Sequence, residues 1–257
     1  MYKIVFFDVD GTLLSETDKS MSHSTRQAIV QLMDKGIKVV VATGRPYSLC
    51  HEFKALGVDT FISANGALVK CNEEIIHKHV LTAETVRNVS AFAELNGHSV
   101  SYFTEKYLMN GIGHDNQRVV SALEETLSII DFPEKSSLAE EIYGMCLYAD
   151  DSEAQKFVNQ FPFLQFKRWH HYVMSVFEKS VVTKSSAIHK VLEHFGLNRS
   201  EAIAFGDGGN DVDMLEYVGL GIAMGNGEQR LKETADFVTK KASEDGIAFA
   251  LKKFGII

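Results

Sequence analysis

Three short polar runs in this sequence each follow an apolar segment, and each carries side chains that can handle charge. The runs are residues 8–12 (Asp-Val-Asp-Gly-Thr), residues 43–45 (Thr-Gly-Arg) and residues 206–211 (Gly-Asp-Gly-Gly-Asn-Asp). Carboxylates that lie close together repel one another unless a cation neutralises them, and a site made of oxygen ligands favours Mg²⁺ over Zn²⁺. If the three runs converge in the fold, they predict a magnesium site that handles phosphate.

Residues that suit phosphate chemistry accompany these acids. The hydroxyl of Thr43 and the amide of Gly44 can donate to phosphate oxygens, and Lys184, at the start of a predicted helix, can supply positive charge. A carboxylate can attack phosphorus and form an aspartyl-phosphate. In an extended chain the side chains of Asp8 and Asp10 share one face, so one can be the nucleophile while the other moves protons. The alternative is that the acids are only helix caps and turn formers, which explains one acid more easily than three clusters on three strand ends.

The segments around the polar runs predict a parallel sheet. The continuous apolar run from Lys3 to Asp8 suits a strand that is buried on both faces. A helix expected from Thr25 to Lys35 and a strand from Ile37 to Ala42 complete a βαβ unit, which has a right-handed crossover. The same alternation returns near the end of the chain, with strands expected at residues 202–205 and 220–224. Since parallel strands end at the same edge of a sheet, the polar runs are expected to meet there.

The middle of the chain follows a different pattern. Predicted helices there are residues 83–96, 116–127 and 152–161, and predicted strands are residues 100–103, 142–149, 163–168 and 172–177. We therefore expect an α/β fold whose core is a doubly wound, Rossmann-like parallel sheet made of residues 1–81 and 180–257. An α+β cap domain, residues 82–179, is inserted between the two halves of the core. An insert in this position is a natural lid over an active site.

Composition excludes several classes of protein. The 257 residues are 45% hydrophobic and carry a formal net charge of −8, which suits a folded, soluble protein and would repel a nucleic-acid backbone. The apolar runs are too short to cross a membrane, and Asp8 and Asp10 interrupt the first run before a signal peptide could form. The three cysteines have no CxxC spacing and are expected to be reduced thiols. We expect a cytoplasmic protein that binds a small molecule rather than nucleic acid or a membrane.

Taken in order, the polar signatures resemble those of a known family. The signatures are Asp8-Val9-Asp10-Gly11-Thr12-Leu13, Thr43-Gly44-Arg45, Lys184 and Gly206-Asp207-Gly208-Gly209-Asn210-Asp211. They are similar to the four motifs of the haloacid dehalogenase (HAD) superfamily of phosphotransferases. Two further stretches, Asn65-Gly66-Ala67 and Asp245-Gly246-Ile247-Ala248, are typical of its Cof-type phosphatase subgroup, which has a large α+β cap. The resemblance spans nearly the whole chain.

The resemblance implies a nucleophile, a proton-transfer group and a metal site. Asp8 would attack phosphorus and become phosphorylated. Asp10 would protonate the leaving oxygen and then deprotonate the hydrolytic water. Mg²⁺ would be held by the side chains of Asp8 and Asp207 and by the backbone carbonyl of Asp10.

The resemblance also implies residues that bind the phosphoryl group, namely Thr43, Gly44, Lys184 and Asn210. Asp211 would orient Lys184 or a metal-bound water. Lys179 is the alternative to Lys184, and we favour Lys184 because a clear helix follows it.

The function that the resemblance implies is hydrolysis of small phosphomonoesters by a Mg²⁺-dependent phosphatase, through an aspartyl-phosphate on Asp8. Its expected substrates are sugar phosphates, or phosphorylated cofactors such as flavin mononucleotide and pyridoxal phosphate. One alternative is a phosphotransferase or phosphomutase acting on sugar phosphates. Another is a regulator that binds sugar phosphates without turnover, although such a protein has no need of the proton-transferring Asp10.

His170 and His171, which are adjacent in the sequence, are a further pair of potential metal ligands. On a strand their side chains would point to opposite faces. The two histidines are therefore not expected to bind one ion together.

Overall fold

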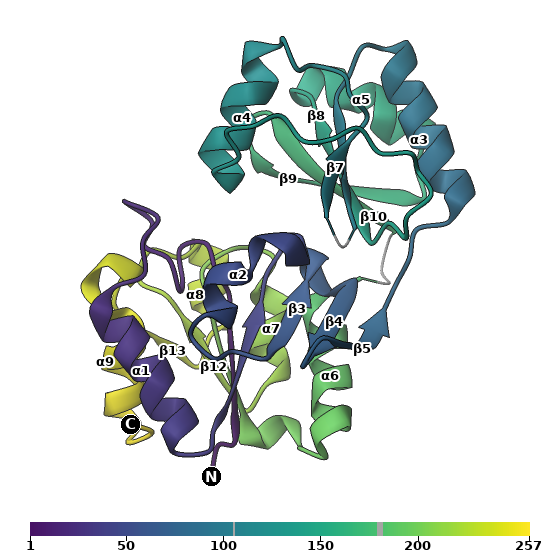
Figure 1. Cartoon of the computed structure of the whole chain (residues 1–257). Coiled ribbons are helices and arrows are strands. Elements are labelled where there is room, and N and C mark those ends of the chain that lie inside the picture. Colours follow the sequence, from purple (N-terminus) through teal and green to yellow (C-terminus); the bar gives the residue numbers. More distant parts are fainter. Residues whose placement is uncertain (105, 179–181) are drawn as a thin grey trace. The chain divides into compact units, whose positions relative to one another are not determined.

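A computed structural model describes residues 1–104, 106–178 and 182–257 (Figure 1). The chain forms two compact units. The first contains residues 1–44, 51–77 and 183–257, and the second contains residues 45–50 and 78–182. The expected fold class is confirmed, because one unit is built on a largely parallel sheet and the other on a separate antiparallel sheet.

The first unit is built on an eight-stranded sheet with the order β13-β12-β11-β1-β2-β3-β4-β5. Its strands are β1 (Ile4–Phe7), β2 (Lys38–Ala42), β3 (Thr60–Ser63), β4 (Leu68–Cys71), β5 (Glu74–Lys78), β11 (Ala202–Gly206), β12 (Leu220–Ala223) and β13 (Phe237–Val238). The strands from β13 to β3 pair in parallel, and β4 pairs with β3 antiparallel. The chain winds outward from β1 in one direction and from β11 in the other, which creates a topological switch point between these two strands.

Helices cover both faces of this sheet (Figure 1). They are α1 (His23–Asp34), α2 (His51–Lys54), α6 (Lys184–Phe195), α7 (Val212–Tyr217), α8 (Gln229–Thr234) and α9 (Gly246–Lys253). Alternate residues of β1, Ile4 and Phe6, pack in one apolar cluster with α6 and α7. Helices α1 and α9 contact each other on the other side of the sheet. Burial on both faces explains why the central strands are continuous apolar runs.

Capping residues mark the ends of two of these helices. Ser22 caps α1, because its side chain accepts a hydrogen bond from the backbone N–H of Thr25. Helix α6 begins after Thr183, whose hydroxyl accepts from the N–H of Ser186, and it ends at Gly196 in the left-handed conformation. Local cap signals therefore determine where these helices begin and end.

The second unit has a five-stranded antiparallel sheet with the order β7-β6-β8-β10-β9. Its strands are β6 (Val100–Phe103), β7 (Tyr107–Met109), β8 (Gly144–Tyr148), β9 (Leu164–His170) and β10 (Val173–Glu178), and its helices are α3 (Ala83–Leu95), α4 (Gln117–Leu127) and α5 (Asp151–Gln160). Apolar residues of α3 and α5 pack with one face of the sheet, as an α+β arrangement requires. The longest helix among the described residues has 13 residues, so no described helix is long enough to cross a membrane.

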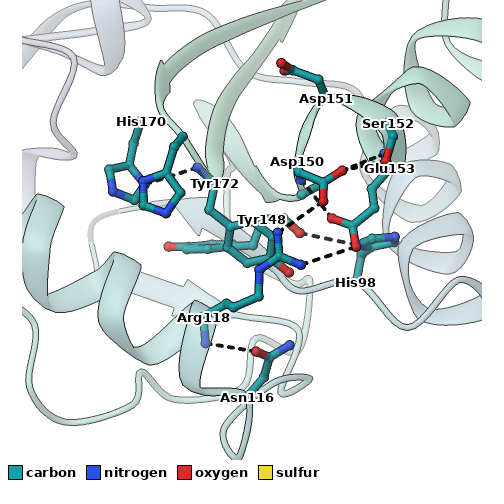
Figure 2. A network of polar contacts seen from close by, with 12 residues as sticks. His98, Asn116, Arg118, Tyr148, Asp150, Asp151, Ser152, Glu153, His170 and Tyr172 are labelled. Atoms are coloured by element: carbon teal, nitrogen blue, oxygen red, sulfur yellow. Dashed lines mark hydrogen bonds and ion pairs between the residues drawn. The ribbon is translucent and has the colours of Figure 1, made fainter.

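A polar network in the second unit ties helix α4 to the start of helix α5 (Figure 2). The guanidinium of Arg118 lies 3.9 Å from the centre of the Tyr172 ring and donates to Asp150 Oδ2 at 3.1 Å. Asp150 also caps α5, because its Oδ1 accepts from the N–H of Glu153. The network satisfies helix-end donors that packing alone would leave without partners.

Gly66 fixes the close approach of two segments in the first unit. It lies in the turn after β3, has a φ of +111°, and a Cβ at this position would lie 2.2 Å from the carbonyl oxygen of Thr183. Thr183 is the residue that caps α6. The absence of a side chain at Gly66 therefore lets the β3 turn pack against the start of α6.

We predict that Gly66→Ala lowers the free energy of unfolding by about 3 kcal/mol, because the new methyl group meets backbone and the φ angle is unfavourable. Gly36→Ala is the matched control, since Gly36 also has a positive φ (+74°) but has open space around it. The control is expected to lose only about 1 kcal/mol. Urea unfolding of both variants measures the difference, and equal losses would show that the close approach is unimportant.

Candidate active site

The register of the central strands brings the three polar runs to one edge of the sheet. Phe7 of β1 pairs with Phe205 of β11 on one side and with Val41 of β2 on the other. The residues that follow these positions therefore leave the sheet at nearly the same level. Asp8 and Asp207 therefore lie at the switch point between β1 and β11, and Thr43 follows the neighbouring strand β2 at the same edge of the sheet.

The turns that follow β1 and β11 pack directly against each other. Gly11 has a φ of +81°, and a Cβ at this position would lie 2.2 Å from Asp207 Oδ2. Thr12 Oγ1 donates a hydrogen bond to Asp207 Oδ1 at 3.2 Å. The backbone of one turn thus forms the surface on which the carboxylate of the other turn rests.

Lys184 lies fully buried between two carboxylates. Its Nζ is 2.6 Å from Asp8 Oδ1 and 2.6 Å from Asp211 Oδ1. The ammonium therefore neutralises part of the charge of the cluster and holds Asp8 in place. The alternative residue, Lys179, lies outside the described residues.

Asp211 braces the turn after β11 as well as Lys184. Its Oδ2 accepts hydrogen bonds from the backbone N–H groups of Asp207 and Gly208, both at 3.0 Å, while its Oδ1 faces Lys184. Since both oxygens are engaged in this way, the geometry suits the orienting role expected for Asp211 better than direct binding of a metal.

Asp213 contributes to the site, although the sequence did not predict it. Its Oδ2 accepts from the backbone N–H of Ser185 at 2.7 Å, and Ser185 follows Lys184 in the first turn of α6. An acid at the start of a helix satisfies an unpaired N–H and interacts favourably with the helix dipole. Asp213 therefore helps to fix the helix end that carries Lys184.

The remaining predicted residues lie beside Asn65, which the sequence analysis placed only in a family-like stretch. Thr43 is buried directly after β2, and its carbonyl accepts from the N–H of Asn65 at 3.0 Å. Asn65 Oδ1 in turn accepts from Asn210 Nδ2 at 3.0 Å, and it lies 3.1 Å from where a Cβ on Gly44 would be. Asn65 has a φ of +55°, a turn conformation that the pair Asn65-Gly66 indicates in the sequence.

The cluster holds more negative charge than one lysine can neutralise. Burial, with the charges of Asp211 and Asp10 adding to it, raises the pKa of Asp207 to about 7. Burial and the charge of Asp211 also raise the pKa of Asp8 well above its ordinary value, against the opposing effect of Lys184. Burial disfavours the charged form of Lys184, but Asp211 and Asp8 outweigh it and raise the pKa of the ammonium. The site is therefore suited to a further positive charge.

The donor atoms fit a hard divalent cation such as Mg²⁺. The carboxylates of Asp8 and Asp207 are the candidate ligands, and with an oxygen of Asp211 their oxygens all lie within 4.8 Å of one another. A donor set made only of oxygen favours Mg²⁺ over softer metals. The side chain of Asp10 is not part of this carboxylate group among the described residues, and its predicted contribution is its backbone carbonyl.

A second group of potential ligands, Glu125, His170 and His171, lies in the second unit. The expectation that the two histidines point to opposite faces is wrong. Their ring centres are 4.0 Å apart, because His170 ends β9 and His171 lies in the turn that follows. However, the N–H of Tyr172 donates to His170 Nδ1 (Figure 2), so the neutral ring carries its proton on Nε2 and donates it to Glu125. We therefore interpret this group as a hydrogen-bonded cluster rather than a metal site.

Comparisons with known proteins agree with this fold. The family model of haloacid dehalogenase-like hydrolases matches residues 5–251. The chain is 35% identical to YkrA of Bacillus subtilis (strain 168), over 99% of this chain and 98% of YkrA. It is 28% identical to YitU of the same organism, named a 5-amino-6-(5-phospho-D-ribitylamino)uracil phosphatase, over 98% of this chain and 97% of YitU. Among solved structures, the HAD subclass IIB sugar phosphatase BT4131 matches with a TM-score of 0.87 and 32% identity, over 99% of this chain and 100% of that chain.

We predict that Lys184→Met lowers the free energy of unfolding by about 3–5 kcal/mol, because it leaves two buried carboxylates without their countercharge. Lys190→Met on the same helix is the matched control. Lys190 pairs with Glu193 on the exposed surface, and its loss is expected to cost at most about 1 kcal/mol. Urea unfolding at neutral pH in the presence of EDTA compares the two variants. Equal destabilisation would contradict the role of Lys184 as a buried countercharge.

Proposed function

Since this chain belongs to the family of haloacid dehalogenase-like hydrolases, we propose that it is a Mg²⁺-dependent phosphatase that hydrolyses small phosphomonoesters through an aspartyl-phosphate on Asp8. One observation carries the proposal. Asp8 follows β1 at the switch point of the sheet, and its Oδ1 lies 2.6 Å from the buried Nζ of Lys184. A carboxylate held beside a fixed positive charge is arranged to attack an anionic phosphate ester.

In the first step, a carboxylate oxygen of Asp8 forms a bond to phosphorus, and the bond between phosphorus and the ester oxygen breaks. Asp10 gives its proton to the departing oxygen, which leaves as an alcohol. The products of this step are the alcohol, the phosphorylated Asp8 and the ionised Asp10.

In the second step, a water oxygen forms a bond to phosphorus, and Asp10 takes a proton from that water. The bond between phosphorus and Asp8 breaks, inorganic phosphate leaves, and Asp8 is again a carboxylate. Asp10 is protonated at the end of the cycle, so it is ready for the next ester.

The phosphoryl group is bound by residues from two strand ends and one helix: Thr43, Gly44, Lys184 and Asn210. Lys184 supplies charge to the phosphoryl oxygens while Asp211 keeps its ammonium in place. The residues that would hold Mg²⁺ are the side chains of Asp8 and Asp207 and the carbonyl of Asp10. When bound, Mg²⁺ supplies positive charge that lets an anionic nucleophile approach an anionic substrate.

The substrates that we propose are small phosphate esters, either sugar phosphates or phosphorylated cofactors of the flavin mononucleotide and pyridoxal phosphate class. The names of the relatives support this range, since YitU is named for a phosphoribitylamino-uracil and BT4131 is described as a sugar phosphatase. We assign residues 1–81 and 180–257 to the catalytic core and residues 82–179 to the cap. We place the protein in the cytoplasm, without nucleic-acid partners. The net charge of −8 and the three buried cysteines, Cys50, Cys71 and Cys146, which are not joined in disulfides, support this assignment.

We predict that the protein releases phosphate from p-nitrophenyl phosphate and from members of a panel of sugar phosphates, flavin mononucleotide and pyridoxal phosphate. Release is expected to need Mg²⁺ and to stop when EDTA is added. Asp8→Asn is expected to reduce release to background, because an amide is a poor nucleophile. Asp18→Asn, which changes an exposed loop carboxylate, is the control and is expected to keep wild-type activity. Near wild-type turnover by a folded Asp8→Asn variant would exclude Asp8 as the nucleophile, and no release by the folded wild-type protein would favour a phosphotransferase or a binding protein.

Asp10→Asn tests proton transfer separately from metal binding. The rate constant kcat is expected to fall by roughly 10²–10⁴-fold, since an amide cannot exchange the proton. The affinity for Mg²⁺ is expected to change little, because the proposed ligand is the backbone carbonyl, which the substitution leaves in place. Kinetics at saturating substrate and calorimetric titration with Mg²⁺ give the two values. A large loss of Mg²⁺ affinity would mean instead that the side chain of Asp10 is a ligand.

A further inference from the structure

Asn226 makes three hydrogen-bond contacts at the edge of the site. It lies in the Gly-Asn-Gly turn after β12. Its Nδ2 donates to the carbonyl oxygen of Gly11 at 2.8 Å and also faces Asp207 Oδ2 at 3.4 Å. Its Oδ1 accepts from the backbone N–H of Ala242 at 2.9 Å. One amide thus joins the turns after β1 and β11 to the short helical turn that begins at Ala242.

The partners of Asn226 determine which way its amide points. The carbonyl of Gly11 can only accept a hydrogen bond, and the N–H of Ala242 can only donate one. The amino group of Asn226 must therefore face Gly11 and Asp207. A flipped amide would lose both short contacts.

The amino group of Asn226 lies beside the carboxylate of Asp207 and the backbone that supports it. Asp207 Oδ1 accepts from Thr12 Oγ1, and Oδ2 lies over the backbone of Gly11, where even a Cβ would come within 2.2 Å. Asn226 donates to the carbonyl of that same Gly11 and faces that same oxygen of Asp207. It therefore fixes the surface against which the carboxylate rests, as well as one side of the carboxylate itself.

The turn that carries Asn226 is itself held to Asp207. The N–H of Glu228 donates to the carbonyl of Asp207 at 2.9 Å, and the N–H of Gly227 donates to the carbonyl of Met224 at 2.9 Å. The amide of Asn226 is therefore held in place before any ligand binds. Because it is neutral, it provides a donor without adding charge to a site that already contains several carboxylates.

We propose that Asn226 is a positioning residue for Asp207, whose carboxylate it holds in the orientation that binds the divalent cation. The inference rests on the proposed role of Asp207 as a metal ligand. Groups that orient a metal ligand through hydrogen bonds typically change metal affinity by about 10–100-fold when they are replaced.

Asn226→Asp tests the donor function at nearly constant shape. A carboxylate at this position keeps the acceptor for the Ala242 N–H but loses the donor to Gly11 and Asp207. We expect the dissociation constant for Mg²⁺, measured by calorimetry without substrate, to rise by roughly 10-fold or more. Added negative charge alone would strengthen cation binding, so weaker binding identifies the lost donor. Asn198→Asp, in an exposed turn of the same unit, is the matched control and is expected to bind Mg²⁺ as the wild type does.

The kinetics provide a readout that loss of stability would not give. For Asn226→Asp, the Mg²⁺ concentration at half-maximal activity is expected to rise by roughly 10-fold, while kcat at saturating Mg²⁺ changes less. Unchanged or tighter Mg²⁺ binding by Asn226→Asp would overturn the proposal. If that variant does not fold, Asn226→Ala is titrated instead, and unchanged binding overturns the proposal equally.

Asp207→Asn separates this proposal from the proposed function. If Asp207→Asn abolishes Mg²⁺ binding while Asn226→Asp does not weaken it, only the role of Asn226 fails. If the folded Asp207→Asn variant binds Mg²⁺ as the wild type does, Asp207 is not a ligand, and the proposed metal site fails with it.

Discussion

The buried ammonium of Lys184 is the interaction on which the rest of the site depends. Two carboxylates, those of Asp8 and Asp211, meet it at 2.6 Å in a region closed to solvent. Without it, the burial of these acids would oppose folding, because a charged group taken out of water must be paired. The position of helix α6 follows from this constraint, because α6 must begin where its first residue, Lys184, reaches the ends of β1 and β11. Thr183, Asp213 and the close approach at Gly66 all act on that helix start.

The order of the strands in the sheet also determines how the turns of the site pack together. The strands β1 and β11 are parallel neighbours, and the chain continues from β1 toward one edge of the sheet and from β11 toward the other. The turns that follow the two strands can therefore pack against each other. Gly11 allows the closest part of that packing, and Asn226 joins a third turn to it. The carboxylate of Asp207 is therefore oriented by the hydroxyl of Thr12 and the amide of Asn226, which belong to neighbouring turns. Such an arrangement keeps its geometry when the charge on the site changes, as it must when an anionic substrate arrives.

The sequence revealed those features that depend on local pattern. The strands β1 and β11, which end just before Asp8 and Asp207, are apolar runs, so their positions and the meeting of the two acids could be predicted. The strand Tyr107–Met109 was missed, because its three residues are too few to show the apolar run on which the core strands were recognised. The error at His170 and His171 came from extending a strand through a turn. The contacts of Asn226 join turns that are far apart in sequence, so no local pattern could reveal them.

The pairing of β1 with β11 has a consequence for how the protein is made. Phe7 and Phe205 are neighbours in the sheet but are roughly 200 residues apart in the chain, and the second unit, with its own apolar core, is encoded between them. During synthesis the first strands leave the ribosome long before their central partner exists, whereas the inserted unit can complete its own sheet. The nascent chain must therefore keep the apolar edge of β1 from aggregating until β11 arrives. Asp8 is therefore synthesised long before Lys184, Asp207 and Asp211, the residues that lie around it, so this cluster can form only after the second unit has been made.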